Sequence, residues 1–488
     1  MARNRIRITL LAMAGLAALQ AAWILALIPY FGIDEFDHGM RASAVVNGQV
    51  LAPHKTLPGK IGRGDLIEVR PDVVRTARPA CEARAYTQLY NCRPWRELAN
   101  GKVVVANAAA RYNPTYYAAV GIIAEPFHGM ANLYALRIAT AGLGCALFGL
   151  AVWIAASSAR SRWQVVAVIV GATPTTIYST TVVSPNGIEL VAGIGLWVST
   201  FALLDREGDG RRRLYYGSAA LFAAVLTNTH TLGILCVGLI AATLLLLYGG
   251  RALWRALRPW AAAEGIVAVL GAAAIGFGIA WILVSGANDP SLEHSKFGGQ
   301  PWSYLAQGLV LWPLQAIGAF PLRNEAAPLI TYAFALTVIS WLVVRAIRTS
   351  GIRSRPAAAI LVAAVASLLV PAALTWQAFD QIGPAWQGRY GMPFSVGLII
   401  MAGRILDSGA RIPHWDNFAA GTCLGVVAAI ELPSLIKVVN DQGSSTSLIA
   451  DTGWTAPATV LLAVAVAAAA ACWVALVRDT GPEVDVPA

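Results

Sequence analysis

The sequence alternates between apolar blocks of roughly 20 residues and shorter polar segments. A helix of about 20 apolar residues crosses a hydrocarbon core of about 30 Å. The pattern therefore predicts an all-α polytopic membrane protein with about twelve transmembrane helices. The predicted spans are 8–30, 132–156, 163–182, 187–204, 214–229, 231–248, 262–285, 328–347, 357–376, 391–405, 417–437 and 456–477.

These spans predict how the chain divides between the membrane and its two sides. The segments are an N-terminal transmembrane helix at 1–30, a large extracytoplasmic loop with interfacial helices at 31–131, a transmembrane bundle at 132–285, an extracytoplasmic or re-entrant segment at 286–327, a C-terminal transmembrane bundle at 328–478 and a cytoplasmic tail at 479–488. The stretch at 302–320 is long enough to cross, but crossing would place the arginines at 345–355 outside. We therefore expect it to re-enter or to lie at the interface.

The large loop has a pattern of its own. The runs "DLIEVR" and "KVVVAN" are β-like and lie among glycine and proline, which predicts a small extracytoplasmic α/β subdomain after the first helix. The following "PTYYAAVGIIAEPF" is too short to span and predicts an interfacial helix. Cys81 and Cys92 share this loop, whereas the other cysteines lie in apolar blocks. In an oxidising exterior these two would form a disulfide.

Composition and charge agree with this topology. The chain is 57% hydrophobic and 13% charged, with a formal net charge of +10. Its arginines cluster in short segments between spans, and such segments stay on the cytoplasmic side. We therefore expect a multi-pass plasma-membrane protein with both termini in the cytoplasm. Membrane lipids, not nucleic acid, are the expected partners of the basic charge. The first apolar block ends in no clean cleavage site and predicts a retained anchor helix.

The motif "DEFDH" gathers acids just after the first span. If a helix starts near Asp34, helical spacing places Asp34, His38 and Arg41 on one face, with Glu35 and Asp37 pointing elsewhere; alternatively, Asp34 is the N-cap. An acidic cap beside a solvated loop would explain the cluster without any function. However, carboxylates at membrane depth are costly unless they are used. Adjacent acids can have pKa values that are pushed apart, which suits a general base.

Two further motifs lie near predicted helix ends. In "RYNPTYYAAVG", Tyr116 and Tyr117 belong either to an aromatic belt at the interface or to one wall of an outward-facing pocket. In "TVVSPNGIEL", a simple turn explains Asn186 but not Glu189, which is an ionisable group within an apolar helix. Such a group is a functional candidate by default.

The motif "WQGRYGMPF" places Arg389 and Tyr390 at the outer end of a span. An arginine there either snorkels to the interface or clamps a phosphate group through two parallel hydrogen bonds. Arg137 raises the same question at the outer start of another span. His230 and His294 stand alone and fit polar turns. The sequence contains no P-loop, GxGxxG, CxxC pair or GxSxG motif, which argues against nucleotide hydrolysis and serine chemistry.

Taken in order, "DEFDH", "NPTYYAAVG", "SPNG" and "QGRYGMP" resemble the motifs of a family of bacterial integral-membrane proteins related to the GT-C glycosyltransferases. The motifs extend from Asp34 to Pro393, with a departure at Ile33, where that family usually has proline. The resemblance implies a GT-C-like fold. It also implies transfer of a sugar from a polyprenyl-phosphate donor to a cell-envelope glycan or lipid-linked acceptor on the extracytoplasmic face.

By this resemblance, Asp34 or Glu35 is the catalytic base and Arg389 binds the donor phosphate. The other candidate substrate-binding residues are His38, Arg41, Tyr116, Tyr117, Arg137, Asn186, Glu189 and Tyr390. An acidic pair could hold a divalent cation, but two acids are too few ligands to predict a metal site. Two other functions stay open at this point. One is a transporter or flippase of lipid-linked glycans, which would favour ionisable groups at the bilayer midplane; the other is a non-catalytic partner of envelope glycan assembly.

Overall fold

The computed structural model describes residues 2–52, 62–205, 210–286, 301–322, 325–383, 386–409, 413–441 and 458–479. The tail predicted at 479–488 lies outside these residues except for Asp479, as do His294 and most of the first half of the segment predicted at 286–327. In the first half of the chain the helices are α1 (Ala2–Ala26), α2 (Glu35–Val46), α3 (Pro71–Glu82), α4 (Leu89–Cys92), α5 (Pro114–Ala124), α6 (Gly129–Ser158), α7 (Trp163–Gly171), α8 (Pro174–Ser179), α9 (Asn186–Asp205), α10 (Arg212–Thr229), α11 (Gly233–Tyr248) and α12 (Gly250–Leu257). In the second half they are α13 (Ala262–Ser285), α14 (Pro301–Ile317), α15 (Leu329–Ser350), α16 (Arg355–Ile382), the 3₁₀ helix η3 (Gly388–Gly391), α17 (Met392–Ser395), α18 (Gly397–Ser408), α19 (Pro413–Ala429), α20 (Glu431–Asp441) and α22 (Ala458–Asp479).

Within the described residues, eight helical stretches are long and apolar enough to cross a membrane. They are Arg3–Ala26, Gly129–Ser158, Asn186–Asp205, Ala262–Ser285, Leu329–Ser350, Arg355–Asp380, Trp415–Asp441 and Thr459–Val477. Each coincides with one of the predicted spans. The remaining predicted spans, at 163–182, 214–229, 231–248 and 391–405, correspond to helices that are shorter, interrupted or less apolar. The predicted total of about twelve spans is therefore not confirmed.

The predicted span at 163–182 is interrupted in its middle. α7 ends at Gly171, and α8 begins at Pro174 after a cap by Thr173, whose side chain accepts a hydrogen bond from the N–H of Thr176 at 3.4 Å. Proline has no backbone N–H and disfavours helical geometry in the residue before it, so a helix starts at a proline more readily than it continues through one. A single proline thus divides an apolar block that by length alone would span the membrane.

Two other predicted helices are also divided. The long apolar run at 214–248 separates as predicted: α10 ends at Thr229, His230 is its C-cap, and α11 begins at Gly233. The span predicted at 391–405 is instead built from η3, α17 and α18, with Pro393 in the first turn of α17. The chain therefore enters α18 through two short turns.

α14, predicted to re-enter the membrane or to lie at the interface, packs against α8, α16 and η3. The hydroxyl of Thr173 donates to the carbonyl oxygen of Ala316 at 2.8 Å, and the side-chain oxygen of Gln315 accepts from the N–H of Gly388 at 2.7 Å. A Cβ at Gly388 would collide with the carbonyl oxygen of Trp312. The glycine of the "QGRY" motif therefore lets η3 approach the backbone of α14.

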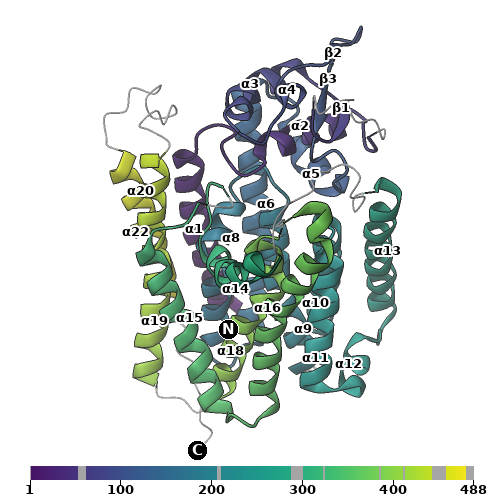
Figure 1. The fold of residues 1–488 in the computed structure, drawn as a ribbon. Coiled ribbons are helices and arrows are strands. Elements are labelled where there is room, and N and C mark those ends of the chain that lie inside the picture. The colour runs from purple at the N-terminus through teal and green to yellow at the C-terminus, as the bar shows by residue number, and fades with distance from the viewer. Residues whose placement is uncertain are drawn as a thin grey trace, which may run out of the picture.

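α2 to α5 and the three strands form a cap at one end of the helical bundle (Figure 1). The strands are β1 (Asp65–Val69), β2 (Arg96–Glu97) and β3 (Val103–Asn107), and they pair antiparallel in the order β1-β3-β2. Because side chains alternate along a strand, Ile67 and Val105 join the main core, while Leu66 and Val104 form a separate small cluster. Cys81 and Cys92 form a disulfide with their Cα atoms 5.5 Å apart.

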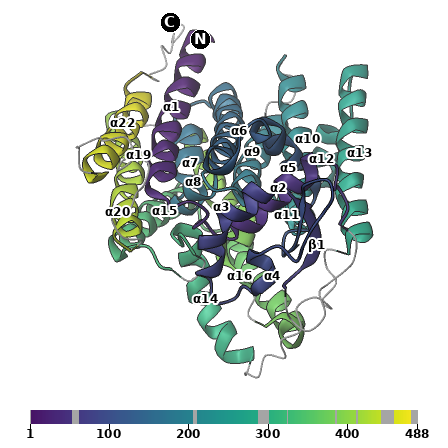
Figure 2. The same ribbon diagram turned by 90° about the horizontal axis from the view of Figure 1, so that it is seen from above.

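The bundle beneath the cap is arranged around α6 and α9. α9 packs against α6 and α10, and α1 packs against α6 and α22. Seen from above, α19, α20 and α22 lie on the side of α1, and α12 and α13 lie on the opposite side (Figure 2). The start of α2 and the segment that contains η3 are far apart in the sequence but meet beneath the cap, where Asp34 approaches Arg389.

Candidate functional site

The turn after α1 places Asp34 at the edge of a cavity. Tyr30 and Asp34 both adopt left-handed backbone, with φ of 60° and 53°, a conformation that aspartate tolerates better than most residues. Asp34 is the N-cap of α2, but its side chain makes no capping hydrogen bond and is 43% exposed. Its carboxylate lies 3.8 Å from Nη2 of Arg389 and accepts a 3.4 Å hydrogen bond from the hydroxyl of Tyr86. The turn thus presents an accessible carboxylate beside a cation.

Glu35, the next residue, is enclosed. Arg137 of α6 donates two hydrogen bonds to it, from Nε to Oε1 at 2.8 Å and from Nη2 to Oε2 at 2.6 Å, and both side chains are fully buried. The backbone N–H groups of Val183 and Gly32 also donate to its carboxylate, at 3.1 and 3.3 Å. Arg137 donates further to the carbonyl oxygen of Leu27 at 3.0 Å. Neither member of the pair is among the described residues that line the cavity. The pair therefore acts as a joint between α2 and α6.

His38 and Arg41 both contact Tyr117, as expected for residues on one face of α2. Asp34 lies before the first helical turn, so helical spacing does not extend to it. His38 lines the cavity, and its Nδ1 lies 2.7 Å from the hydroxyl of Tyr117, which is fully buried behind it. Burial lowers the pKa of His38 to about 4, so the ring is neutral at pH 7. Arg41 is not among the described lining residues of the cavity, and it donates to backbone carbonyl groups of the cap, including that of Tyr112 at 3.1 Å.

Asp37, which helical spacing pointed elsewhere, also lines the cavity. It is 5% exposed, and its Oδ1 accepts a hydrogen bond from the N–H of Ala108 at 3.0 Å. Burial raises the pKa of Asp37 to about 7; the charge of Asp34 adds to the rise, and the hydrogen bond from Ala108 opposes it. The cavity therefore contains a half-exposed carboxylate and a buried carboxyl group that titrates near neutral pH.

The cavity has a volume of about 420 Å³. Its lining comes from the start of α2 at 33–38, the segment 86–91, the segment 108–112 after β3, the segment 387–390, and the side chains of Arg63, Leu322 and Glu325. Four aromatic side chains, several hydroxyl and amide groups, and both Asp34 and Asp37 face it. A mixed aromatic and polar lining of this kind is typical of sites that bind small polar molecules.

A row of rings connects α2 with the "QGRY" motif. Ring centroids lie 5.4 Å apart between His38 and Tyr112, 6.1 Å between Tyr112 and His230, and 5.1 Å between His230 and Tyr390. The guanidinium of Arg389 lies 5.4 Å from the centroid of Tyr390. Nε of Arg389 is buried and has no hydrogen-bond partner within the described part of the chain. The rings hold Arg389 near Asp34, although Arg389 itself is not among the described lining residues of the cavity.

A second cavity, of about 290 Å³, lies on the other side of the segment 386–391. Apolar side chains of α14, α15, α16 and α18 form most of its lining. Gln387 and Tyr390 line the first cavity, and Trp386 and Gly388 line the second. The segment that carries the arginine therefore separates a polar cavity under the cap from an apolar cavity among long helices.

The remaining candidate residues lie behind the first cavity. The hydroxyl of Tyr116 forms a 2.8 Å hydrogen bond with that of Thr140. Asn186 begins α9, and Glu189 is 1% exposed and lies close enough to Arg389 for their charges to interact. Among the described residues, the cavity lining includes neither Tyr116, nor Asn186, nor Glu189.

The structure also tests the ligand set for a metal. Across the described ranges, no three or more His, Cys, Asp and Glu side chains come together in a group that could hold a metal ion.

Sequence reasoning missed several residues of the site. Asp37 stood in "DEFDH" and was visible as an acid, but helical spacing alone pointed it away. His230 was expected to serve only in a turn. Tyr112 stood in the motif "RYNPTYYAAVG" without being singled out, and nothing in the sequence distinguishes Tyr86 from the other tyrosines, because the roles of both depend on how the cap folds onto the bundle.

Comparison with known proteins places these motifs in a family. The profile of the family described as "Predicted membrane protein (DUF2142)" matches residues 18–398, a range that includes all four motifs. Two solved structures, of ArnT from Cupriavidus metallidurans in the apo state and bound to undecaprenyl phosphate, each align with 96% of this chain and 76% of their own, at 14% identity and a TM-score of 0.45. That likeness is too weak to argue function. No curated protein matches the sequence.

Proposed function

Because the chain belongs to the DUF2142 family of predicted membrane proteins, we propose that this site is the active site of a GT-C-like glycosyltransferase. The donor is a sugar on polyprenyl phosphate, and the acceptor is a hydroxyl group of a cell-envelope or lipid-linked glycan. One observation carries the proposal. Asp34, a half-exposed carboxylate, lies 3.8 Å from Arg389 where a polar cavity and an apolar cavity adjoin.

The two cavities suit the two ends of a lipid-linked donor. A polyprenyl chain is apolar and fits the cavity among α14, α15, α16 and α18, whereas its sugar fits the polar cavity under the cap. The phosphate between them falls at the segment that carries Arg389. A guanidinium can bind phosphate through two parallel hydrogen bonds, and Nε of Arg389 lacks a partner among the residues described.

The chemistry follows from these positions. Asp34 accepts the proton of the acceptor hydroxyl as its oxygen attacks the anomeric carbon of the sugar. The bond between that carbon and the phosphate oxygen breaks, and its electron pair leaves on polyprenyl phosphate. Arg389 stabilises the negative charge that develops on the leaving phosphate. General-base catalysis of this kind contributes about 10²–10⁴-fold to a rate.

The proposed topology places the cap on the extracytoplasmic side of the membrane. The Arg-rich segments between spans then lie inside, in agreement with the distribution of positive charge in membrane proteins. The disulfide in the cap fits an oxidising compartment. Both termini are then cytoplasmic, and the acceptor meets the site from the envelope side.

Arg389 gives the direct test. The wild-type protein, reconstituted in lipid nanodiscs with radiolabelled polyprenyl-phosphate sugars and a deacylated envelope glycan, is expected to release polyprenyl phosphate and label the glycan. Arg389→Gln should reduce this transfer at least tenfold by removing a charged hydrogen bond to the donor. Arg348→Gln, which alters an exposed arginine of α15, is the matched control. Transfer by Arg389→Gln at the wild-type rate would show that Arg389 does not bind the donor phosphate.

Transport of a lipid-linked glycan is the second candidate, and two buried acids favour it. Glu189 and Glu431 lie in candidate membrane spans, and Oε1 of each is buried with no hydrogen-bond partner among the described residues. Ionisable groups in spans often mark transport pathways. In sealed vesicles, movement of an intact donor across the bilayer, without cleavage of its sugar–phosphate bond, would support transport and oppose the enzymatic proposal.

A further inference from the structure

We propose that the segment 84–91, here called the strap, is the wall of the polar cavity that binds a neutral, hydroxyl-rich carbohydrate acceptor. Tyr86 on the strap, Asp37 on α2 and Gln387 before η3 are the groups that hold this acceptor. The inference rests on the proposed function and goes further by naming the chemistry of the second substrate and the residues that recognise it.

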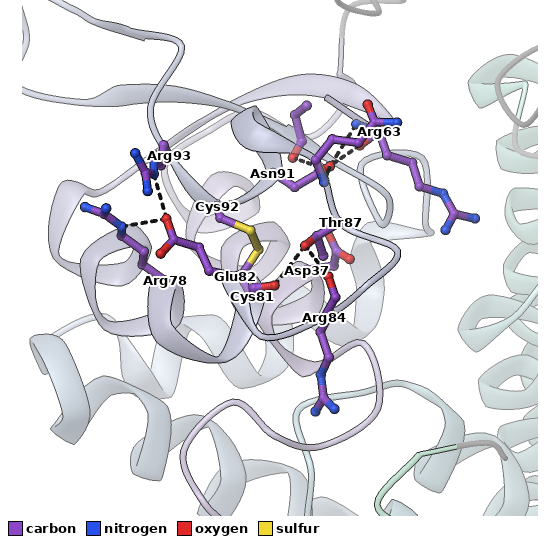
Figure 3. The surroundings of a disulfide bond; sticks show 12 residues. Asp37, Arg63, Arg78, Cys81, Glu82, Arg84, Thr87, Asn91, Cys92 and Arg93 are labelled. Carbon is purple, nitrogen blue, oxygen red and sulfur yellow. Dashed lines mark hydrogen bonds and ion pairs between the residues drawn. A yellow bond between two sulfur atoms is a disulfide. The ribbon is translucent and has the colours of Figure 1, made fainter. Parts of the chain in front are cut away.

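The strap is fixed at both ends. The Cys81–Cys92 disulfide closes it into a loop, and the hydroxyl of Thr87 donates to the carbonyl oxygen of Cys81 at 2.8 Å (Figure 3). Arg84 donates from Nη2 to the carbonyl oxygen of Phe31 at 2.7 Å, and its guanidinium lies 4.5 Å from the centroid of the Phe31 ring. The strap is thereby attached to α3 and to the turn that carries Asp34.

The strap turns Tyr86, Thr87 and Asn91 towards the cavity. Asn91 is used within the fold: its amide donates to the carbonyl oxygens of Arg63 and Ala106, at 2.7 and 2.9 Å. Tyr86 is 41% exposed, so its ring presents a free face at the mouth of the cavity. Its hydroxyl reaches Asp34 at 3.4 Å, which places whatever binds against Tyr86 next to the proposed base.

Asp37 and Gln387 supply hydrogen-bond acceptors to the same cavity. Oδ1 of Asp37 is held by the N–H of Ala108 at 3.0 Å, while Oδ2 takes no hydrogen bond from the part of the chain that the structure describes. Gln387 is 6% exposed, and its buried Oε1 likewise has no partner in the described ranges. Both residues line the cavity. A buried acceptor without a donor, such as Oε1 of Gln387, carries a free-energy cost that a ligand with O–H groups would remove.

The lining selects among ligand classes. A sugar offers O–H donors for Asp37 and Gln387, and its C–H faces can lie against rings such as those of Tyr86 and Tyr112. An anionic group at this wall would instead meet the carboxyl groups of Asp34 and Asp37 at close range, which is unfavourable. Arg63 also lines this cavity, but among the described lining residues the carboxyl groups of Asp34, Asp37 and Glu325 outnumber it. The strap side therefore suits a neutral polyol.

The test separates acceptor binding from transfer. Binding of a panel of methyl glycosides of hexoses and pentoses to the reconstituted protein is measured by saturation-transfer NMR, and KM is measured for acceptor and donor. Asp37→Asn and Tyr86→Leu are expected to weaken glycoside binding and to raise the acceptor KM, Asp37→Asn by about tenfold, with the donor KM unchanged. Tyr90→Leu is the matched control, because Tyr90 packs on the small cluster of Leu66, Val104 and Ala106 and is not among the described lining residues of the cavity.

The outcomes distinguish this inference from the proposed function. Glycoside binding that is lost in Asp37→Asn but not in Tyr90→Leu supports the strap wall even if the wild type transfers no sugar, in which case only the enzymatic proposal fails. If the wild type transfers sugar but Asp37→Asn and Tyr86→Leu keep its acceptor KM, or if no glycoside of the panel binds the wild type, the strap wall is wrong.

Discussion

Asp34 and Glu35 are neighbours in the sequence but belong to two regions that use a carboxylate differently. In the buried pair, Glu35 meets Arg137 and two backbone N–H groups, and both side chains are fully buried. In the cavity pair, Asp34 is 43% exposed and 3.8 Å from Arg389, and Nε of Arg389 has no partner in the described structure. A buried ion pair stabilises a fold only when its remaining hydrogen bonds are also made. The satisfied pair connects two helices, and we propose that the unsatisfied pair binds a ligand.

The largest expected effect lies in the buried pair. Arg137→Gln leaves the carboxylate of Glu35 buried without its counter-charge, which costs about 3–5 kcal/mol of stability. We expect a large fall in the thermal unfolding midpoint in detergent. The double variant Glu35→Gln/Arg137→Gln should recover much of the loss, because it removes the lone charge. A single variant as stable as the wild type would show that the pair is not a joint.

The disulfide of the cap comes next. Replacing both Cys81 and Cys92 by serine releases a short loop, which the chain-entropy account values at about 3 kcal/mol. Hydrogen exchange should show faster opening of α3 and the strap, with little change in α6 or α9. Reductant should produce the same change in the wild type and none in the double variant. Equal protection of the cap with and without the disulfide would contradict this expectation.

The pH dependence of stability tests the protonation of Asp37, which lines the cavity together with Asp34. Its pKa is raised from 3.8 to about 7, chiefly by burial and then by Asp34, against the Ala108 hydrogen bond and the charge of Arg63. The native state therefore holds a proton that the unfolded chain releases, so this contribution to stability falls as pH rises towards 7, by about 1 kcal/mol per pH unit.

The measurement is the difference in unfolding midpoint between the wild type and Asp37→Asn from pH 5 to pH 8. That difference should favour the wild type at pH 5 relative to pH 8. His38, whose pKa is lowered to about 4, acts in the opposite direction below pH 6.5 but is common to both proteins and cancels. A difference that does not vary with pH would place the pKa of Asp37 at its ordinary value.

The smallest expected effect concerns Tyr116. Tyr116→Phe removes one hydrogen bond to Thr140 behind the cavity, which costs about 1 kcal/mol. The unfolding midpoint should fall slightly, and sugar transfer by the folded protein should be unchanged. A loss of transfer without a loss of stability would show that Tyr116 takes part in the site, although it does not line the cavity.

Sequence patterns predicted the parts of the fold that depend on one segment at a time. The lengths of apolar blocks located the eight candidate spans, and the boundary between the predicted spans 214–229 and 231–248 located the break at His230. Block length failed at 163–182, because Pro174 starts a new helix inside an apolar run. Helical spacing failed at Asp34, because Asp34 itself has left-handed backbone and lies just before the first residue of α2.

The site depended on contacts that no local pattern contains. "DEFDH" and "QGRY" identified Asp34 and Arg389 as candidates, but only the packed structure brings them to 3.8 Å. The same packing pairs Glu35 with Arg137 and brings Arg41 within hydrogen-bonding distance of backbone carbonyl groups. Which of two adjacent acids is used for structure could not be read from the sequence, because their partners come from other helices.

The most direct test of the account compares Asp34→Asn with Glu35→Gln in one preparation. For Asp34→Asn we expect an unchanged unfolding midpoint and a kcat for sugar transfer that is about 10²–10⁴-fold lower, as for loss of a general base. For Glu35→Gln we expect a lower midpoint, with the folded fraction keeping most of its kcat. Wild-type kcat in folded Asp34→Asn would contradict the central claim.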